Sequence, residues 1–135
     1  MASIFTKIVR GEIPCHKIAE DDRFLAFLDV NPLAKGHTLV IPKQEIDYIF
    51  DIEDQLLTDL VLFSKNVSKA IKSAIPCNRI GVTVIGLEVP HAHIHLIPIN
   101  NLGDMNFSNP RCVFSSEEMQ EIAKVIVAKI DRVGA

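Results

Sequence analysis

Apolar residues recur at helical spacing in two parts of the chain. Between residues 53 and 74 they return every three or four positions, and Pro76 then marks the end of this predicted helix. The stripe comprises Leu56, Leu60, Phe63, Val67, Ala70, Ile71 and Ala74. Nearer the C-terminus, Ser115 and Glu118 have the spacing of a capping box and predict the start of a second helix. Its apolar face comprises Met119, Ile122, Ala123, Ile126, Val127 and Ile130.

Five shorter segments have the pattern of strands. Segments 17–20 and 24–29 flank a turn at 21–23, and three further strands are predicted at 37–43, 79–86 and 91–98. Ser3 and Gly11 bound a short predicted helix, and polar loops follow at 30–36 and 100–110. Because strands occur on both sides of one long helix, we expect an α+β domain with a largely antiparallel sheet.

Composition and charge exclude several classes of partner. The chain has 135 residues, which suggests a single domain, and a net charge of −3 with both signs interspersed. Since no basic stripe is present, a nucleic-acid polymer is not expected as a partner. No apolar run reaches the ~18 residues that span a bilayer, and the N-terminus lacks the pattern of a signal peptide. The three cysteines are far apart, so we expect reduced thiols in a cytoplasmic protein.

The segment "VPHAHIHLIP" carries the most informative pattern in the chain, because His91, His93 and His95 occupy every second position. In a strand, these three rings would share one face while the intervening apolar residues enter the core. Three histidines in register rarely serve only as polar surface positions. Imidazoles can ligate a transition metal, or one can act as a nucleophile at phosphorus. The triplet alone does not choose between these two chemistries.

A fourth histidine and one carboxylate add to this pattern. His37 begins the strand "HTLVIPK", and antiparallel neighbours could bring it beside the triplet. Asp29 follows a strand with Phe24, Phe27 and Leu28, so an apolar wall adjoins one carboxylate. This combination suits a nucleoside, whose base packs on carbon while the carboxylate accepts hydrogen bonds from the ribose hydroxyls. The alternative for Asp29 is a turn-initiating residue that binds its own backbone.

These segments together resemble the histidine triad (HIT) family, in its branch of nucleoside phosphoramidate and dinucleoside polyphosphate hydrolases. The resemblance rests on "IFTKIVRGEIP", "EDDRFLAFLDVNPLAKGHTLVIPK" and "VPHAHIHLIP". It covers most of residues 4–98. We therefore expect a single domain over 1–135, with 1–98 as the family core and 99–135 as a loop and an additional C-terminal helix. The resemblance implies a five-stranded antiparallel sheet, a homodimer, and purine nucleotides (AMP or GMP derivatives) as substrates. It also implies hydrolysis or transfer at the α-phosphate through a covalent nucleotidyl-histidine, with no cofactor and no metal required.

The resemblance also assigns roles to single residues. His93 matches the nucleophile, His95 and His37 match positions at the phosphate oxygens and leaving group, and His91 falls in a supporting network. Asp29 matches the ribose-binding residue. The positions that match the base pocket are Ile4, Phe5, Ile8, Ile13, Phe27 and Val30. Two other functions stay open: a nucleotide-binding regulatory protein with little turnover, and a metal-binding protein that uses the histidine strand.

One run departs from the family pattern. Relatives often have Gly-Gln-Ser/Thr-Val before the first histidine, whereas this chain has "GLEV", with Leu87 and Glu88 in the middle. Glu88 is therefore either a contact for a cationic, amine-bearing leaving group or an ordinary surface glutamate. Lys35 and Lys43 lie near the expected phosphate by sequence and are expected to be solvated. The N-terminal CxxC that helps to hold a structural zinc in some bacterial relatives is absent, so no such zinc is expected.

Overall fold

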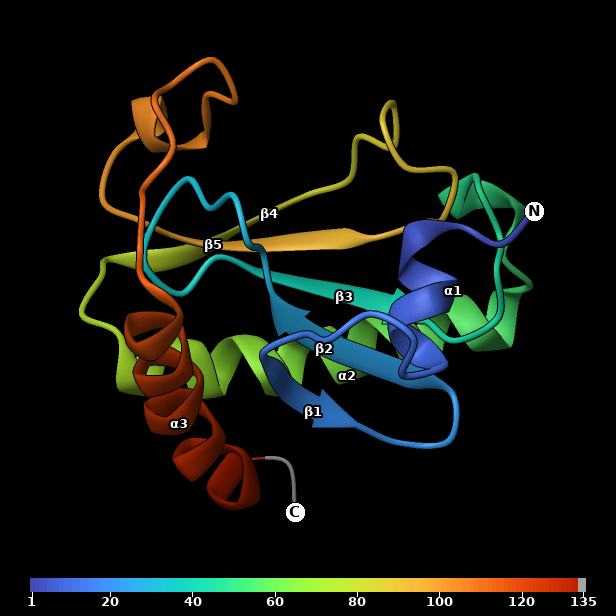
Figure 1. Ribbon diagram of the computed structural model, residues 1–135, viewed down its shortest axis with the longest axis horizontal. Coiled ribbons are helices and arrows are strands. Elements are labelled where there is room, and N and C mark those ends of the chain that lie inside the picture. Colours follow the sequence, from blue (N-terminus) through green and yellow to red (C-terminus); the bar gives the residue numbers. More distant parts are fainter. Residues whose placement is uncertain (134–135) are drawn as a thin grey trace.

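Five antiparallel strands form one sheet across the molecule (Figure 1). The computed structural model describes residues 1–133, with side chains through residue 130. The strands are β1 (Lys17–Glu20), β2 (Phe24–Leu28), β3 (Thr38–Pro42), β4 (Arg79–Thr83) and β5 (Ile94–Ile99). Their order in the sheet is β1-β2-β3-β5-β4, with every neighbouring pair antiparallel. The predicted α+β class with a five-stranded antiparallel sheet is confirmed.

The helices cover the two faces of this sheet unequally. The helices are α1 (Ile4–Val9), α2 (Asp54–Ala74) and α3 (Ser116–Val133), with short 3-10 helices η1 (Ile49–Asp51) and η2 (Leu102–Met105). Helix α2 runs along one face, and α3 packs against α2 and β1 (Figure 1). The short α1 lies on the opposite face. None of the helices described is both long enough and apolar enough to cross a membrane.

Strand alternation divides the apolar residues between two clusters. Phe24, Ala26 and Leu28 of β2 enter the large cluster beneath α2 and α3, whereas Leu25 and Phe27 enter a smaller one beneath α1. The neighbouring strands alternate in the same way, with Val40, Ile94 and Leu96 on the α2 side and Leu39 and Ile41 on the α1 side. Because the cluster beneath α1 is small, α1 covers only part of its face of the sheet. The uncovered part leaves room for a site.

Several predicted boundaries are wrong by a few residues. Strand β4 ends at Thr83 rather than at residue 86, where Gly86 turns the chain with a φ of 74°. Strand β5 begins at Ile94, so two of the three histidines precede it. The predicted polar loop contains η2. Val127 is 43% exposed, because it follows the buried Ile126 directly and is turned about 100° from it around the helix.

The capping predictions are confirmed in detail. The Ser3 side chain accepts from the backbone N–H of Thr6 at 3.0 Å and caps α1. At α3, Ser115 Oγ accepts from Glu118 N at 3.0 Å, while a Glu118 carboxylate oxygen accepts from Ser115 N at 2.8 Å. These reciprocal bonds satisfy backbone donors that a helix start would otherwise leave unpaired.

Candidate active site

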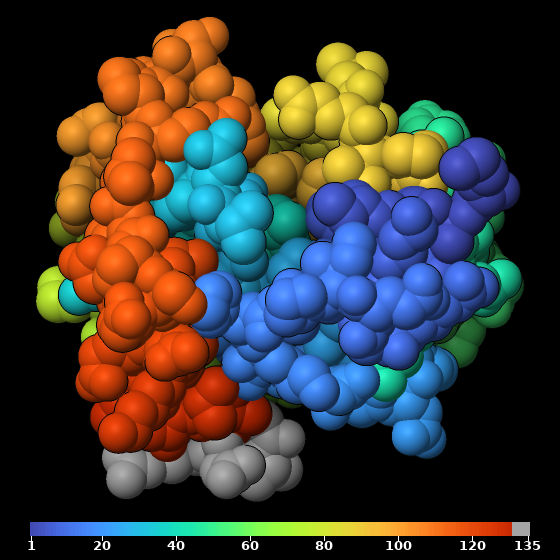
Figure 2. Space-filling view, in the orientation of Figure 1, coloured from blue at the N-terminus to red at the C-terminus, as the bar shows by residue number. Residues whose placement is uncertain are grey.

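A cavity of about 490 Å³ opens on the α1 face of the sheet. Figure 2 shows the hollow between α1 and the loops that follow β4 and β5. All the apolar residues predicted for the base pocket line it, namely Ile4, Phe5, Ile8, Ile13, Phe27 and Val30. Asp29, Glu88, His93 and His95 line it too, whereas His37 and His91 lie behind its wall.

The ring of His93 is held by a hydrogen bond that fixes its tautomer. Its Nδ1 lies 2.7 Å from the carbonyl oxygen of His91, which can only accept a hydrogen bond. The hydrogen of the neutral ring is therefore on Nδ1, and Nε2 carries the free electron pair. Phe5 packs edge-on against the ring, with a centroid distance of 5.0 Å. The carbonyl and the phenyl ring together fix the orientation of the imidazole in the cavity wall.

His37 and His95 are joined by a hydrogen bond beside His93. The backbone N–H of Leu33 donates to His37 Nδ1 at 3.0 Å, so the hydrogen of His37 is on Nε2. That Nε2 donates to His95 Nδ1 at 3.0 Å, which in turn places the hydrogen of His95 on its own Nε2. Among the described residues, none accepts a hydrogen bond from His95 Nε2. Cross-strand pairing of Leu39 with His95 produces this approach, as the sequence predicted.

Burial keeps this histidine pair neutral. Removal from water lowers the pKa of His95 to about 3, with the neighbouring His37, His93 and Arg111 adding to the effect. Burial likewise lowers the pKa of His37 to about 4, although the Asp29 carboxylate opposes it. Near neutral pH the pair therefore carries no charge, and His95 offers a neutral N–H donor to the cavity.

Asp29 makes the predicted turn interaction and also lines the cavity. Its Oδ1 accepts from Asn31 N at 2.8 Å, which is the turn interaction. Its Oδ2 lies 3.5 Å from His37 Nε2 and belongs to the cavity wall. The loop closes because Asp29 N donates to His37 O at 2.9 Å and Gly36 adopts a φ of 91°. A Cβ on Gly36 would lie 3.1 Å from Ile75, so both backbone and packing require glycine there.

His91 lies on the same face of the chain as His93 and His95, as predicted. Ala92, Ile94 and Leu96 all enter the cluster beneath α2, and the Phe5 ring packs against both His91 and His93. The expectation that all three rings lie on an open face is wrong for His91, because the N-terminal segment covers it. The residue is fully buried, its Nε2 donates to Pro42 O at 2.8 Å, and its Nδ1 accepts from Ser3 Oγ at 2.8 Å. His91 supports the site through its carbonyl oxygen, which holds His93.

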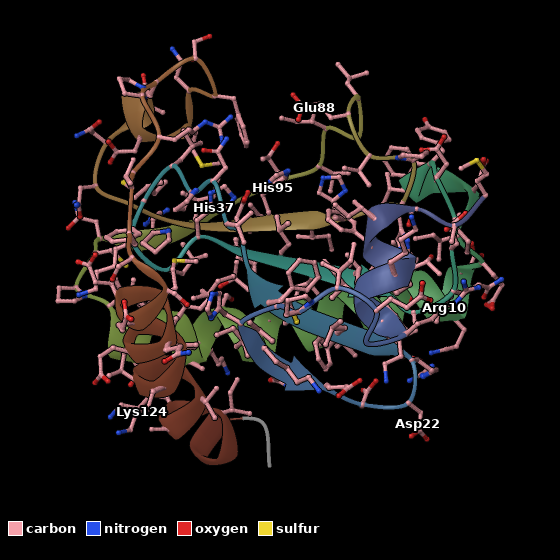
Figure 3. The ribbon with its side chains drawn as sticks, viewed as in Figure 1. Arg10, Asp22, His37, Glu88, His95 and Lys124 are labelled. Atoms are coloured by element: carbon pink, nitrogen blue, oxygen red, sulfur yellow. The ribbon has the colours of Figure 1, made fainter. Side chains whose placement is uncertain are left out.

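The loop after β4 forms the upper rim of the cavity. Leu87 is 89% exposed, and both Leu87 and Glu88 line the opening. Figure 3 shows Glu88 on this loop above the sheet, with His37 and His95 side by side below. Glu88 is exposed and lines the opening of the cavity.

Some residues of the wall were not found by sequence reasoning, among them an aromatic ring and a cation. Phe107 and Arg111, from the loop between β5 and α3, both line the cavity. The Phe107 ring packs edge-on against His95, with a centroid distance of 5.0 Å. No spacing in the sequence indicates this approach, since the loop contacts the site only through tertiary structure.

Three of the side chains could also hold a cation. The donor atoms of Asp29, His37 and His95 all lie within 4.8 Å of one another. Neutral imidazoles with a carboxylate are a ligand set that suits Zn²⁺. The histidine triplet itself does not converge on one point, because both ring nitrogens of His91 are already hydrogen-bonded.

Comparisons with known proteins agree with this geometry. The chain is 37% identical over 135 residues to adenosine 5′-monophosphoramidase hnt1 of Schizosaccharomyces pombe, an alignment that covers 96% of this chain and 99% of that protein. It is 36% identical over 100 residues to adenylylsulfatase HINT3 of Arabidopsis thaliana, covering 70% of this chain and 51% of that protein. The crystal structure of a HIT-like protein involved in cell-cycle regulation from Bartonella henselae matches it with a TM-score of 0.82 and 34% identity, covering 93% of this chain and 94% of that chain.

A family model described as the HIT domain matches residues 10–102, which is more than half of the chain and contains all four histidines of the site. Family, fold and side-chain arrangement are therefore consistent with one another. The chain belongs to the HIT family of nucleotide hydrolases.

Proposed function

We propose that this HIT-type hydrolase cleaves purine nucleoside phosphoramidates or dinucleoside polyphosphates at the α-phosphate, through a covalent nucleotide on His93. The observation that carries the proposal is the hydrogen bond from His93 Nδ1 to the His91 carbonyl. In the neutral ring this bond places the hydrogen on Nδ1 and the electron pair on Nε2, in the wall of a cavity large enough for a mononucleotide. It also steadies the positive charge that develops on the ring during attack.

The chemistry proceeds in two displacements. His93 Nε2 forms a bond to the α-phosphorus while the bond from phosphorus to the leaving group breaks and its electron pair departs with that group. A water molecule then attacks the same phosphorus, which releases the nucleotide and restores the imidazole, while the proton of the water passes to solvent. His95 Nε2–H donates to a phosphate oxygen or to the leaving atom. No step requires a metal or another cofactor.

The apolar wall and Asp29 support a nucleoside as the common part of the substrate. The base packs among Ile8, Ile13 and Phe27, while the Asp29 carboxylate accepts from the ribose hydroxyls. The names of two relatives, a monophosphoramidase and an adenylylsulfatase, describe different groups leaving from an adenosine 5′-phosphoryl unit. Glu88 at the rim favours an amine among these leaving groups, because a carboxylate attracts a cationic group and repels an anionic one.

Mass spectrometry after brief acid quench with adenosine 5′-phosphoramidate tests the proposal. We expect one adenylyl group per chain on His93, and loss of at least about 10³-fold in turnover for His93→Ala. His16→Asn is the matched control, because His16 lies outside the cavity wall. Turnover that survives in His93→Ala, or an adenylyl group on another residue, contradicts the assignment.

Turnover, AMP binding and metal content test the two alternatives. A nucleotide-binding regulatory protein would bind AMP without measurable turnover. A metal-binding protein would retain one ion per chain after purification without a metal-affinity resin. The cluster of Asp29, His37 and His95 makes the metal measurement worthwhile. A tightly held ion that is lost in Asp29→Asn would favour that alternative.

We also propose a homodimer formed through the exposed edge of β4. Among the described residues, β4 pairs with β5 alone, so the backbone groups of its other edge are available. Val82, Val84 and Ile85 at this edge are 62%, 38% and 45% exposed. Pairing of two such edges would satisfy these groups and bury this apolar surface. We expect light scattering to give twice the chain mass, and Val82→Lys to give the monomer.

A further inference from the structure

The loop between β5 and α3 brings one cation to the cavity from outside the family core. Arg111 and Phe107 line the cavity, although the family match ends at residue 102. The two lysines that lie near the site by sequence do not line it: Lys35 is exposed, and Lys43 pairs with Glu20 at 2.8 Å. Among the described residues, Arg111 is therefore the permanent cation of the cavity wall.

The guanidinium of Arg111 is held in place by the protein. One terminal nitrogen donates to Asn31 O at 2.9 Å, and the other donates to Phe107 O at 3.3 Å. The guanidinium carbon also lies 5.4 Å from the centroid of the Phe107 ring. Cys112 N donates to Pro32 O at 2.9 Å, which ties the same loop to the segment that follows Asp29. Within the part of the chain that the structure describes, the remaining guanidinium N–H groups have no partner and can bind a ligand.

Charge in the cavity makes this cation important. Asp29 and Glu88 are the carboxylates of the wall, and each would repel a phosphate. The rings of His37 and His95 are neutral near pH 7, since burial lowers their pKa values to about 4 and about 3. Neutral imidazoles donate hydrogen bonds but supply no net positive charge. A nucleotide phosphate in this cavity needs a compensating cation, and the wall provides it in Arg111.

We infer that Arg111 binds a non-bridging phosphate oxygen of the nucleotide, through guanidinium N–H groups that the Asn31 and Phe107 carbonyls leave free. The inference rests on the proposed nucleotide hydrolysis and adds a phosphate-binding residue from the part of the chain that follows the family match. Arginine suits the role because its planar donors match the oxygens of a phosphate group. Phe107, which lies between the guanidinium and His95, sets the position of Arg111 relative to the reacting histidines.

A comparison of AMP with adenosine separates phosphate binding from a purely structural role. The two ligands share the base and the ribose, so loosening of the loop would weaken both. Loss of a phosphate contact would weaken AMP alone. We expect Arg111→Gln to raise the Kd for AMP about 10- to 100-fold and to change the Kd for adenosine less than about twofold. Titration calorimetry, with competition for the weaker ligand, measures both constants.

Arg111→Lys and Arg10→Gln complete the set of variants. Lysine keeps the charge without the planar donors. We therefore expect Arg111→Lys to raise the Kd for AMP about two- to fivefold and to leave the Kd for adenosine unchanged. Arg10 lies on the far side of α1 from the cavity (Figure 3), outside its wall, and its loss should change neither constant. If Arg111→Gln does not fold, Arg111→Lys alone decides the question by the same contrast between the two ligands.

Equal weakening of AMP and adenosine in either Arg111 variant overturns the inference, as does an unchanged affinity for AMP. These outcomes differ from failure of the proposed function. If the wild-type protein neither binds AMP nor turns over the phosphoramidate, the nucleotide proposal itself fails. If the wild type does both and the Arg111 variants match it, only the role of Arg111 is wrong.

Discussion

His91 and His95 lie two residues on either side of His93, yet the protein uses them in opposite ways. Both ring nitrogens of His91 are bound within the protein, to Ser3 Oγ and Pro42 O. His95 is bound through Nδ1 alone and keeps its Nε2–H for the cavity. Equal spacing in the sequence therefore does not give equal roles. The ring of His91 completes the structure beneath His93, whereas the ring of His95 lines the cavity.

The largest effect expected to distinguish these two histidines is the loss of turnover in His95→Ala. This change removes the neutral donor from the cavity, so we expect kcat/KM for adenosine 5′-phosphoramidate to fall about 10²- to 10³-fold. Stability should change by no more than about 1 kcal/mol, because His95 borders open space and Asp29 can accept the hydrogen bond from His37. Steady-state kinetics and urea unfolding of one preparation measure both quantities. A large loss of stability without loss of turnover would reverse the comparison.

His91→Ala should give the converse result. The change empties a fully buried position and leaves the Pro42 carbonyl without its donor. We expect unfolding free energy to fall by about 2–4 kcal/mol, from the lost packing and the unpaired acceptor together. Turnover at a temperature where the variant is folded should fall less than in His95→Ala, since the carbonyl that holds His93 belongs to the backbone. Full stability with abolished turnover would show that His91 acts directly.

The sequence predicts most of this arrangement where the pattern is local. Helical stripes and caps located α1, α2 and α3, and the turn at Gly36 together with strand pairing placed His37 beside His95. The buried location of His91 was missed, because alternation places its ring on the α1 face but does not show what covers that face. The cover comes from Ser3 and Phe5, which are far away in sequence.

Arg111 illustrates a second limit of sequence reasoning. Its side chain is fixed by the carbonyl oxygens of Asn31 and Phe107, and every residue type has such a carbonyl. A contact to backbone leaves no pattern of residue types at the other end. Phe5 on α1 and Phe27 on β2 were expected in the cavity wall because they match base-pocket positions of the HIT family, and both line it.

The pH dependence of stability tests how the site histidines are buried. Burial lowers the pKa values of His37, His91 and His95, whereas all three rings titrate near 6.5 in the unfolded chain. Between about pH 6.5 and 4 the unfolded chain therefore binds more protons, and stability falls as the pH is lowered. We expect the free energy of unfolding to fall by about 2 kcal/mol between pH 7 and 5. This is less than the sum over the three histidines, because water reaches the cavity.

Urea midpoints at several pH values measure this loss, and His95→Asn should reduce it. Glu45 contributes only at lower pH. Hydrogen bonds from Ser3 and Thr6 lower its pKa to about 2, so its stabilising effect is lost only below about pH 4.5. A midpoint that is constant from pH 7 to 5 would show that the rings are protonated in the native state as readily as in the unfolded one.

The smallest expected effect concerns Ser3, which connects α1 to His91. Its hydroxyl donates to His91 Nδ1 and accepts from Thr6 N, so Ser3→Ala removes the helix cap and the support of His91 together. We expect a cost of about 1 kcal/mol and at most about a threefold change in kcat, because Pro42 O still holds the ring. Ser3→Thr keeps the hydroxyl and should restore stability to within a few tenths of a kcal/mol. A double-mutant cycle of Ser3→Ala with His91→Ala then separates the two roles. If the hydroxyl matters through His91, the two losses overlap, whereas additive losses would assign the whole effect of Ser3 to the cap of α1.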